Sequence, residues 1–129
     1  MQKIIHQLSW FVGVGCAAAL THWIVVVFAV GTLGYVPLVA NILGWLVAFC
    51  VSFAGHFRLT FRHQQASLWY AARRFFVVSA LGFGVNELSY AFLLHTTPLR
   101  YDVLLALILI AVAAMTFILS RFWAFQHKN

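Results

Sequence analysis

Four long apolar stretches separated by short linkers restrict the folds open to this chain more than any other feature. They lie at about residues 8–30, 38–57, 75–94 and 103–122. A bilayer core needs about 20 apolar residues for each helical crossing. Of the 129 residues, 64% are hydrophobic and only 8% are charged, which leaves too few polar groups to cover a globule in water. We therefore predict an all-α integral membrane protein with four transmembrane helices.

The two halves of the chain are similar in pattern at an offset of about 65 residues. The second and fourth stretches each end in a short polar, cationic and aromatic segment, at residues 52–61 and 116–125. Turn residues, including Gly34, Pro37 and Pro98, close a hairpin in each half. We predict a single transmembrane domain over residues 1–129, formed by a duplicated helical hairpin. Repeat 1 covers about residues 8–61 and repeat 2 about residues 73–125.

The distribution of positive charge predicts an orientation. Of the eight Lys and Arg residues, all except Arg100 lie before the first stretch, around the middle linker or after the fourth stretch. The positive-inside rule then places both termini in the cytoplasm. Both hairpins enter the membrane in the same sense, so an axis along the membrane normal should relate them. Lys and Arg at the cytoplasmic ends of membrane spans account for the net charge of +6. We therefore expect no nucleic-acid partner.

Small residues recur at spacings that let helices approach each other closely. They are Gly44 with Ala48, Ala80 with Gly84, and the run at residues 15–19. Such residues hold together either one bundle or a dimer. We favour packing within the chain, because each helix must first find a partner there.

The sequence gives no basis for enzyme chemistry. It lacks a glycine-rich phosphate loop, and its two acids, Glu87 and Asp102, fall at different depths. The six histidines are scattered, without a pair at i, i+4 on a helix. We therefore expect no catalytic activity, no metal and no cofactor.

Two ionisable residues fall near the middle of the membrane. Glu87 lies about a dozen residues into the third stretch, where a carboxylate costs several kcal/mol unless it is protonated, paired or hydrated. At the repeat offset its counterpart is His22, and Thr21 and Asn86 beside them are also polar. These residues either form interhelical hydrogen bonds that specify packing, or line a polar or proton-linked site. We favour the functional role for Glu87 and the packing role for His22.

Three arginines follow an apolar stretch directly, within an aromatic context: Arg58, Arg62 and Arg121. Membrane topology alone explains cations at these positions. A planar guanidinium at that depth also suits bidentate binding of a phosphate. Trp123, beside Arg121, belongs either to an aromatic belt or to a surface that stacks on a sugar ring.

Taken together, these features resemble the GtrA-like family of small bacterial membrane proteins. The resemblance rests on the two hairpins, the Val-Ala-Asn at residues 39–41 and the ending Ser-Arg-Phe-Trp-Ala-Phe at residues 120–125, and it covers nearly the whole chain. It implies a multi-pass protein of the bacterial inner membrane that serves cell-surface polysaccharide synthesis or glycosylation. The implied activity is that of a flippase, which moves a polyprenyl-phosphate-linked sugar from the cytoplasmic to the outer leaflet.

This implied activity assigns roles to the residues above. Arg58, Arg62 and Arg121 would bind the phosphate, and the polar path for the sugar would comprise His22, Asn41, Asn86, Glu87 and Trp123. Two alternatives stay open: a non-transporting anchor or accessory subunit of a membrane glycosyltransferase, and a small multidrug-type, proton-coupled exporter. Four helices offer little interior for a sugar, so we also expect a homo-oligomer.

Overall fold

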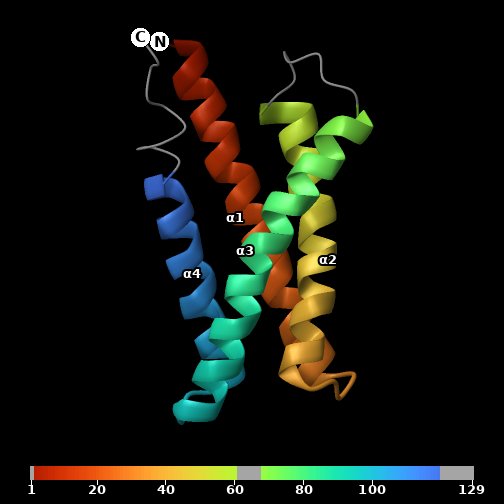
Figure 1. The fold of residues 1–129 in the computed structure, drawn as a ribbon, viewed down its shortest axis with the longest axis vertical. Helices are drawn as coiled ribbons and strands as arrows, with labels where there is room; N and C mark the ends of the chain where they lie inside the picture. The colour runs from red at the N-terminus through yellow and green to blue at the C-terminus, as the bar shows by residue number, and fades with distance from the viewer. Residues whose placement is uncertain (1, 61–67, 120–129) are drawn as a thin grey trace.

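The computed structural model of the chain describes residues 2–60 and 68–119, and every regular element in these ranges is a helix (Figure 1). The elements are α1 (Gln2–Gly31), α2 (Pro37–Gly55), α3 (Leu68–Thr96) and α4 (Tyr101–Leu119). A short π-helix, η1 (His56–Thr60), continues α2. The predicted all-α class is confirmed.

Three of these helices are long and apolar enough to cross a membrane, over Leu8–Gly31, Pro37–Leu59 and Phe76–Thr96. They match the first three predicted stretches within a few residues. In α4 the apolar part is shorter, Tyr101–Met115, and the predicted end of the fourth stretch lies outside the described residues. Large apolar side chains are exposed along the bundle, for example Leu88 at 74% and Ile110 at 67%. Such a surface suits lipid rather than water, so the chain is a membrane protein.

The helices form two antiparallel hairpins that point the same way. In Figure 1 the turns between α1 and α2 and between α3 and α4 lie at one end, which we call the turn end. The start of α1, the end of η1, the start of α3 and the end of α4 lie at the opposite end. We call it the basic end, because Arg58 and Arg73 are exposed there. The side of the membrane that each end faces, and the origin of the hairpins by duplication, stay predictions.

Local backbone chemistry produces the first turn where the sequence predicts it. Gly34 has a φ of 76°, in the left-handed region that favours glycine. Just before α2, Val36 is extended, and Pro37 occupies the start of the helix, where a missing N–H costs nothing. The backbone N–H of Tyr35 donates to the carbonyl of Ala29 at 3.0 Å and ties the turn to the end of α1.

The apolar core lies in the half of the bundle next to the turn end. It takes residues from all four helices, and its members are Val26, Ala29, Ala40, Tyr90, Leu104, Leu105 and Ile108. Each lies within a few helical turns of one of the two connections. Packing therefore holds the four helices together mainly at this end.

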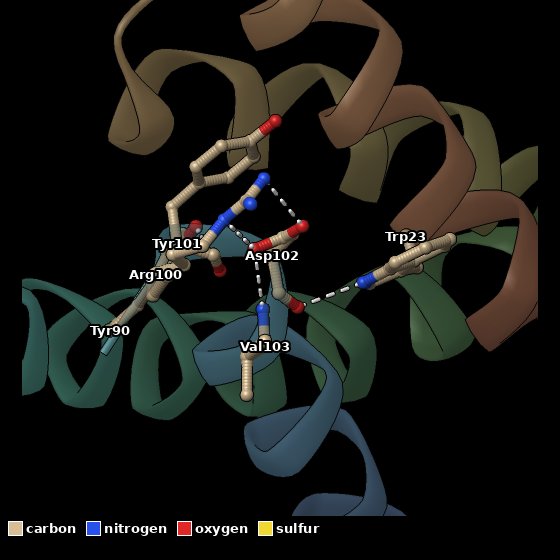
Figure 2. A network of polar contacts seen from close by, with 6 residues as sticks. All are labelled: Trp23, Tyr90, Arg100, Tyr101, Asp102 and Val103. Carbon is tan, nitrogen blue, oxygen red and sulfur yellow. Dashed lines mark hydrogen bonds and ion pairs between the residues drawn. The ribbon is translucent and has the colours of Figure 1, made fainter.

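Polar contacts reinforce the turn end at the start of α4 (Figure 2). The indole N–H of Trp23, in α1, donates to the backbone carbonyl of Asp102 at 2.9 Å. The hydroxyl of Tyr90, in α3, donates to the carbonyl of Tyr101 at 2.9 Å. Arg100 Nε lies 3.3 Å from the Asp102 carboxylate, although the Arg100 side chain is 77% exposed. Two other helices are thus bonded to the first turn of α4.

Glycines allow α1 and α2 to pack closely over most of their length. A Cβ added at Gly44 would lie 2.7 Å from His22 Cδ2 and 2.9 Å from the His22 carbonyl oxygen. A Cβ at Gly55 would lie 2.7 Å from a methyl carbon of Val14. The predicted role of Gly44 in packing within the chain is confirmed. At Gly15 and Gly84 an added Cβ would meet nothing within 4 Å, so these two glycines form no such close contact within the chain, although Ala18 of the predicted run is buried.

Candidate functional site

A hydrogen-bonded network of four polar side chains crosses the interior of the bundle. His22 Nε2 donates to Asn41 Oδ1 at 2.6 Å, which joins α1 to α2. Asn41 Nδ2 donates to Asn86 Oδ1 at 2.8 Å and, more weakly, to Glu87 Oε1 at 3.5 Å, which joins α2 to α3. The structure therefore brings together four of the residues that the sequence predicts for a polar path.

Burial differs among these side chains. Asn41 is 0% exposed, Asn86 3% and His22 5%, whereas Glu87 is only partly buried. The amide of Asn41 uses both its oxygen and its nitrogen and occupies the centre of the network. Among the described residues, every buried side-chain nitrogen or oxygen atom has a hydrogen-bond partner. The network is therefore satisfied without a ligand, as a buried polar group in lipid requires.

The sequence positions the network through one small residue and two neighbours. Gly44 lies three residues after Asn41, on the same face of α2, and its missing side chain admits the ring of His22. In α3, Asn86 and Glu87 are adjacent, so Asn41 reaches both. Asn86 points into the bundle, while Glu87 lies at its edge. The carboxylate is thus the network member most open to a ligand or to a proton.

The surroundings of Glu87 limit what it can do. Among the side chains that the structure describes, no Lys or Arg pairs with Glu87. A carboxylate at this depth is stable only when it is protonated, paired or hydrated. Glu87 can therefore accept a proton, or accept hydrogen bonds from hydroxyl groups of a polar ligand. The amides of Asn41 and Asn86 supply further donors and acceptors beside it.

Arginine does not join this network in the described part of the chain. Arg58 lies in η1 at the basic end, where it is exposed. It follows Asn41 by 17 residues, a helical rise of about 25 Å. The other predicted phosphate ligands, Arg62 and Arg121, and the predicted sugar contact, Trp123, lie outside the described residues. Arg58 is therefore far from the polar network along the helix axis.

An aromatic row on one face of α2 and η1 joins these two positions, and our sequence analysis missed it. Trp45, Phe49, Phe53 and Phe57 follow Asn41 at intervals of four residues, a spacing that the sequence alone reveals. The rings of Phe49 and Phe53 stack at 6.1 Å between centroids, and those of Phe53 and Phe57 at 5.8 Å.

Side chains of α3 complete this aromatic contact. The ring of Trp45 stacks on Phe83 with centroids 4.7 Å apart and an interplanar angle of 11°. Its indole N–H donates to Ser79 Oγ at 2.8 Å. Phe76 meets Phe49 edge to face at 5.5 Å. Aromatic stacking adds about 0.5–1.5 kcal/mol per pair beyond burial, so these contacts bind α2 to α3 firmly near the basic end.

His56 is a second buried histidine, and the sequence patterns predicted no role for it. Its ring is 6% exposed and stacks on Phe11 of α1, with centroids 5.0 Å apart and an interplanar angle of 27°. It lies at the start of η1, one residue after the close contact at Gly55. The stack of His56 on Phe11 therefore extends the contact between the two helices of the first hairpin to the basic end.

No metal site is formed by the part of the chain that the structure describes, because no three His, Cys, Asp or Glu side chains converge there. Cys16 and Cys50 are free thiols and both are exposed. What the described helices offer is a hydrogen-bonding centre in an apolar bundle. Its chemistry suits the binding of a polar group and the transfer of a proton.

These features define a helical membrane protein with a polar network buried in its bundle. The chain belongs to the family described as GtrA/DPMS, transmembrane domain, whose family model matches residues 10–125. The predicted resemblance is therefore confirmed over almost the whole chain. No curated protein and no solved structure matches the chain.

Proposed function

We propose that this protein is a flippase, which moves a polyprenyl-phosphate-linked sugar across the bacterial inner membrane from the cytoplasmic to the outer leaflet. Membership of the GtrA/DPMS family supports a link to glycosyl lipids. The observation that carries the proposal is the network of His22, Asn41, Asn86 and Glu87, buried in a bundle whose outer surface is apolar.

The proposed mechanism exchanges one set of hydrogen bonds for another. A sugar in the hydrocarbon core loses its hydration, and each polar group left unpaired there costs several kcal/mol. Hydroxyl groups of the sugar would replace the contact between Asn41 and Glu87, which is already long at 3.5 Å. The network thereby lowers the free-energy barrier to moving the sugar through the middle of the membrane, where that barrier is highest. No covalent step, cofactor or metal is part of this proposal.

Phosphate binding belongs to the basic end, which we propose faces the cytoplasm. The exposure of Arg58 in η1 supports this proposal, because a guanidinium near the membrane boundary suits a lipid phosphate. We propose the same task for Arg62 and Arg121, and a sugar contact for Trp123, three residues that lie outside the described part of the chain. We further propose a homo-oligomer, since a single small bundle encloses little space.

The first experiment tests transport and the proton at Glu87. Purified protein is placed in liposomes with a labelled polyprenyl-phosphate sugar, and its movement between leaflets is followed from pH 5 to pH 9. The parent protein should transport with a dependence on pH. Glu87→Gln keeps the shape and the hydrogen bond of the side chain but loses the titratable proton, so its transport should be slow and independent of pH. Parent-like transport by this variant at every pH would leave Glu87 with a packing role alone.

A second experiment tests Arg58 as a phosphate ligand. Arg58→Lys keeps the charge but loses the planar pair of donors, so transport should fall even for this change. Arg73, also exposed at the basic end, is the matched control, and Arg73→Lys should transport like the parent. Equal activity of Arg58→Ala and the parent would remove Arg58 from the mechanism.

The same assay separates the other two functions. An accessory subunit would copurify with a membrane glycosyltransferase and would move no lipid on its own. A small multidrug-type exporter would transport cationic drugs, and lipid-linked sugar would not compete with them.

A further inference from the structure

As far as their side chains are described, α1, α3 and α4 each have a face that is covered near the turn end and bare toward the basic end. In α4, Leu105, Ile108, Val112 and Met115 share one face at spacings of three and four residues. Leu105 is 0% exposed and Ile108 6%, whereas Met115 is 46% exposed. The face that forms the core near the turn therefore loses its neighbours farther along the helix.

The corresponding faces of α3 and α1 behave in the same way. In α3, Leu93 packs on the core and Asn86 is buried, but Gly82, on the same face, is exposed. A Cβ added at Gly82 would meet nothing within 4 Å. In α1, Trp23 bonds to Asp102, whereas Cys16, two turns away on that face, is exposed. In Figure 1, α3 and α4 diverge toward the basic end.

Of the three other helix contacts, α1 with α2 and α2 with α3 are closed in this half of the molecule, and α1 with α4 is bonded at Trp23, nearer the turn end. Between α1 and α2, the contacts of Gly44 and Gly55 and the stack of His56 on Phe11 leave no space for another group. Between α2 and α3, Trp45 is bonded to Ser79 and stacked on Phe83, and Phe76 packs on Phe49. A bulky chain cannot pass between these pairs without breaking contacts.

A lipid-linked substrate needs a lateral passage, because its hydrocarbon chain stays in the bilayer while its head group enters the bundle. We propose that the polyprenyl chain passes between the halves of α3 and α4 nearest the basic end, along Gly82 and Met115, and this inference rests on the proposed flippase function. We call this position the α3–α4 seam. It is apolar and built partly from small residues, and at its inner limit lies Asn86 of the polar network. The head group therefore reaches the network while the prenyl chain extends through the seam into lipid.

Two glycines of α3 provide a matched test by transport. Gly82 and Gly84 are two residues apart, so they point to nearly opposite sides of the helix, and an added Cβ meets nothing within 4 Å at either. Gly82→Leu fills the seam and should slow transport in liposomes about tenfold. Gly84→Leu makes the same chemical change on another face and should stay within about twofold of the parent. Parent-like transport by Gly82→Leu would overturn the proposed route and leave the flippase function standing.

Photo-crosslinking tests the occupant directly, even if Gly82→Leu fails to fold. A benzophenone amino acid replaces either Met115, in the seam, or Leu46 on α2, which has a similar exposure of 44%. The liposomes contain phosphatidylethanolamine, phosphatidylglycerol and a trace of labelled long-chain polyprenyl phosphate. We expect the polyprenyl label to be enriched about fivefold at Met115 over Leu46, relative to phosphatidylglycerol.

Each other result of the crosslinking contradicts the proposal. Equal enrichment at the two positions would show that the seam does not select the prenyl chain. Crosslinks at Met115 to a second copy of the protein alone would make the seam an oligomer interface. A parent protein that neither takes up the polyprenyl label nor flips lipid would refute the proposed function together with the route.

Discussion

The half of the bundle near the turn end and the half near the basic end are formed by the same four apolar helices, yet the two halves are packed differently. Near the turn end, core residues of all four helices meet, and hydrogen bonds from Trp23 and Tyr90 bind α1 and α3 to the start of α4. Near the basic end, contacts bind α2 to α1 and to α3, while Met115 of α4 is exposed.

The polar network lies where these two halves meet, and this position explains how it can be both structural and functional. His22, Asn41 and Asn86 are buried, as in the turn half, whereas Glu87 is partly exposed, as in the basic half. A network with one accessible member can exchange a bond with a ligand without exposing the rest. The difference in packing between the halves thus predicts which contacts contribute most to the free energy of unfolding and which take part in transport.

The largest effect on stability should come from Gly44, whose close contact holds α1 against α2. In Gly44→Val the new side chain meets the backbone of His22, so the helices must separate. We expect a loss of about 3 kcal/mol in the free energy of unfolding, measured by SDS titration in mild detergent micelles. Gly82→Val, at a position without neighbours, is the control and should lose much less. Equal losses would contradict the distinction between close and bare faces.

The centre of the network should give the next largest effect. Asn41→Leu keeps the volume but leaves His22 Nε2 and Asn86 Oδ1 without partners, which should cost about 2 kcal/mol. A second variant, Asn41→Leu with Asn86→Leu, removes both amide groups and should recover part of that loss. The coupling is measured as a double-mutant cycle from unfolding free energies. Strict additivity would mean that the two amides do not interact.

A smaller effect is expected for the contact that binds α2 to α3 in the basic half. Ser79→Ala removes the acceptor of the Trp45 indole N–H. Hydrogen bonds between membrane helices average about 0.6 kcal/mol, so the loss of unfolding free energy should be near that value. Trp45→Phe keeps an aromatic ring but removes the N–H donor, so it should lose the same hydrogen bond to Ser79. If Ser79→Ala were as destabilising as Asn41→Leu, the contact of α2 with α3 in the basic half would contribute as much to stability as the hydrogen bonds of Asn41.

The smallest effect should come from the exposed ion pair at the turn end. Arg100 is 77% exposed, and pairs of this kind contribute about 0–1 kcal/mol. Arg100→Gln should therefore leave the melting temperature in detergent nearly unchanged. Asp102→Ala is a sharper change, because the Asp102 carboxylate also accepts the backbone N–H of Val103 at 2.9 Å. Equal losses for Arg100→Gln and Asp102→Ala would show that the hydrogen bond from the Val103 N–H contributes nothing beyond the ion pair.

Several parts of this structure could be predicted because they depend on local pattern. Apolar length predicted the first three spans, and Gly34 with Pro37 predicted the first turn. Polar residues at membrane depth must find partners, so His22, Asn41, Asn86 and Glu87 could be named as one set. The spacing of the aromatic row was also present in the sequence, but the helical pattern does not tell whether such a row packs on a neighbour or faces lipid.

Hydrophobicity and backbone sterics along the chain were enough to predict a membrane protein, its hairpin turns and the polar groups that require partners. The geometry of those partnerships became known only from the arrangement of the helices in space. It placed Asn41 at the centre of the network and Glu87 at its edge. It also showed that Gly44 is a contact while Gly82 and Gly84 are not. The reason is physical: lipid and a neighbouring helix are equally apolar, so hydrophobic periodicity cannot distinguish them, and the choice depends on how side chains from different helices fit together.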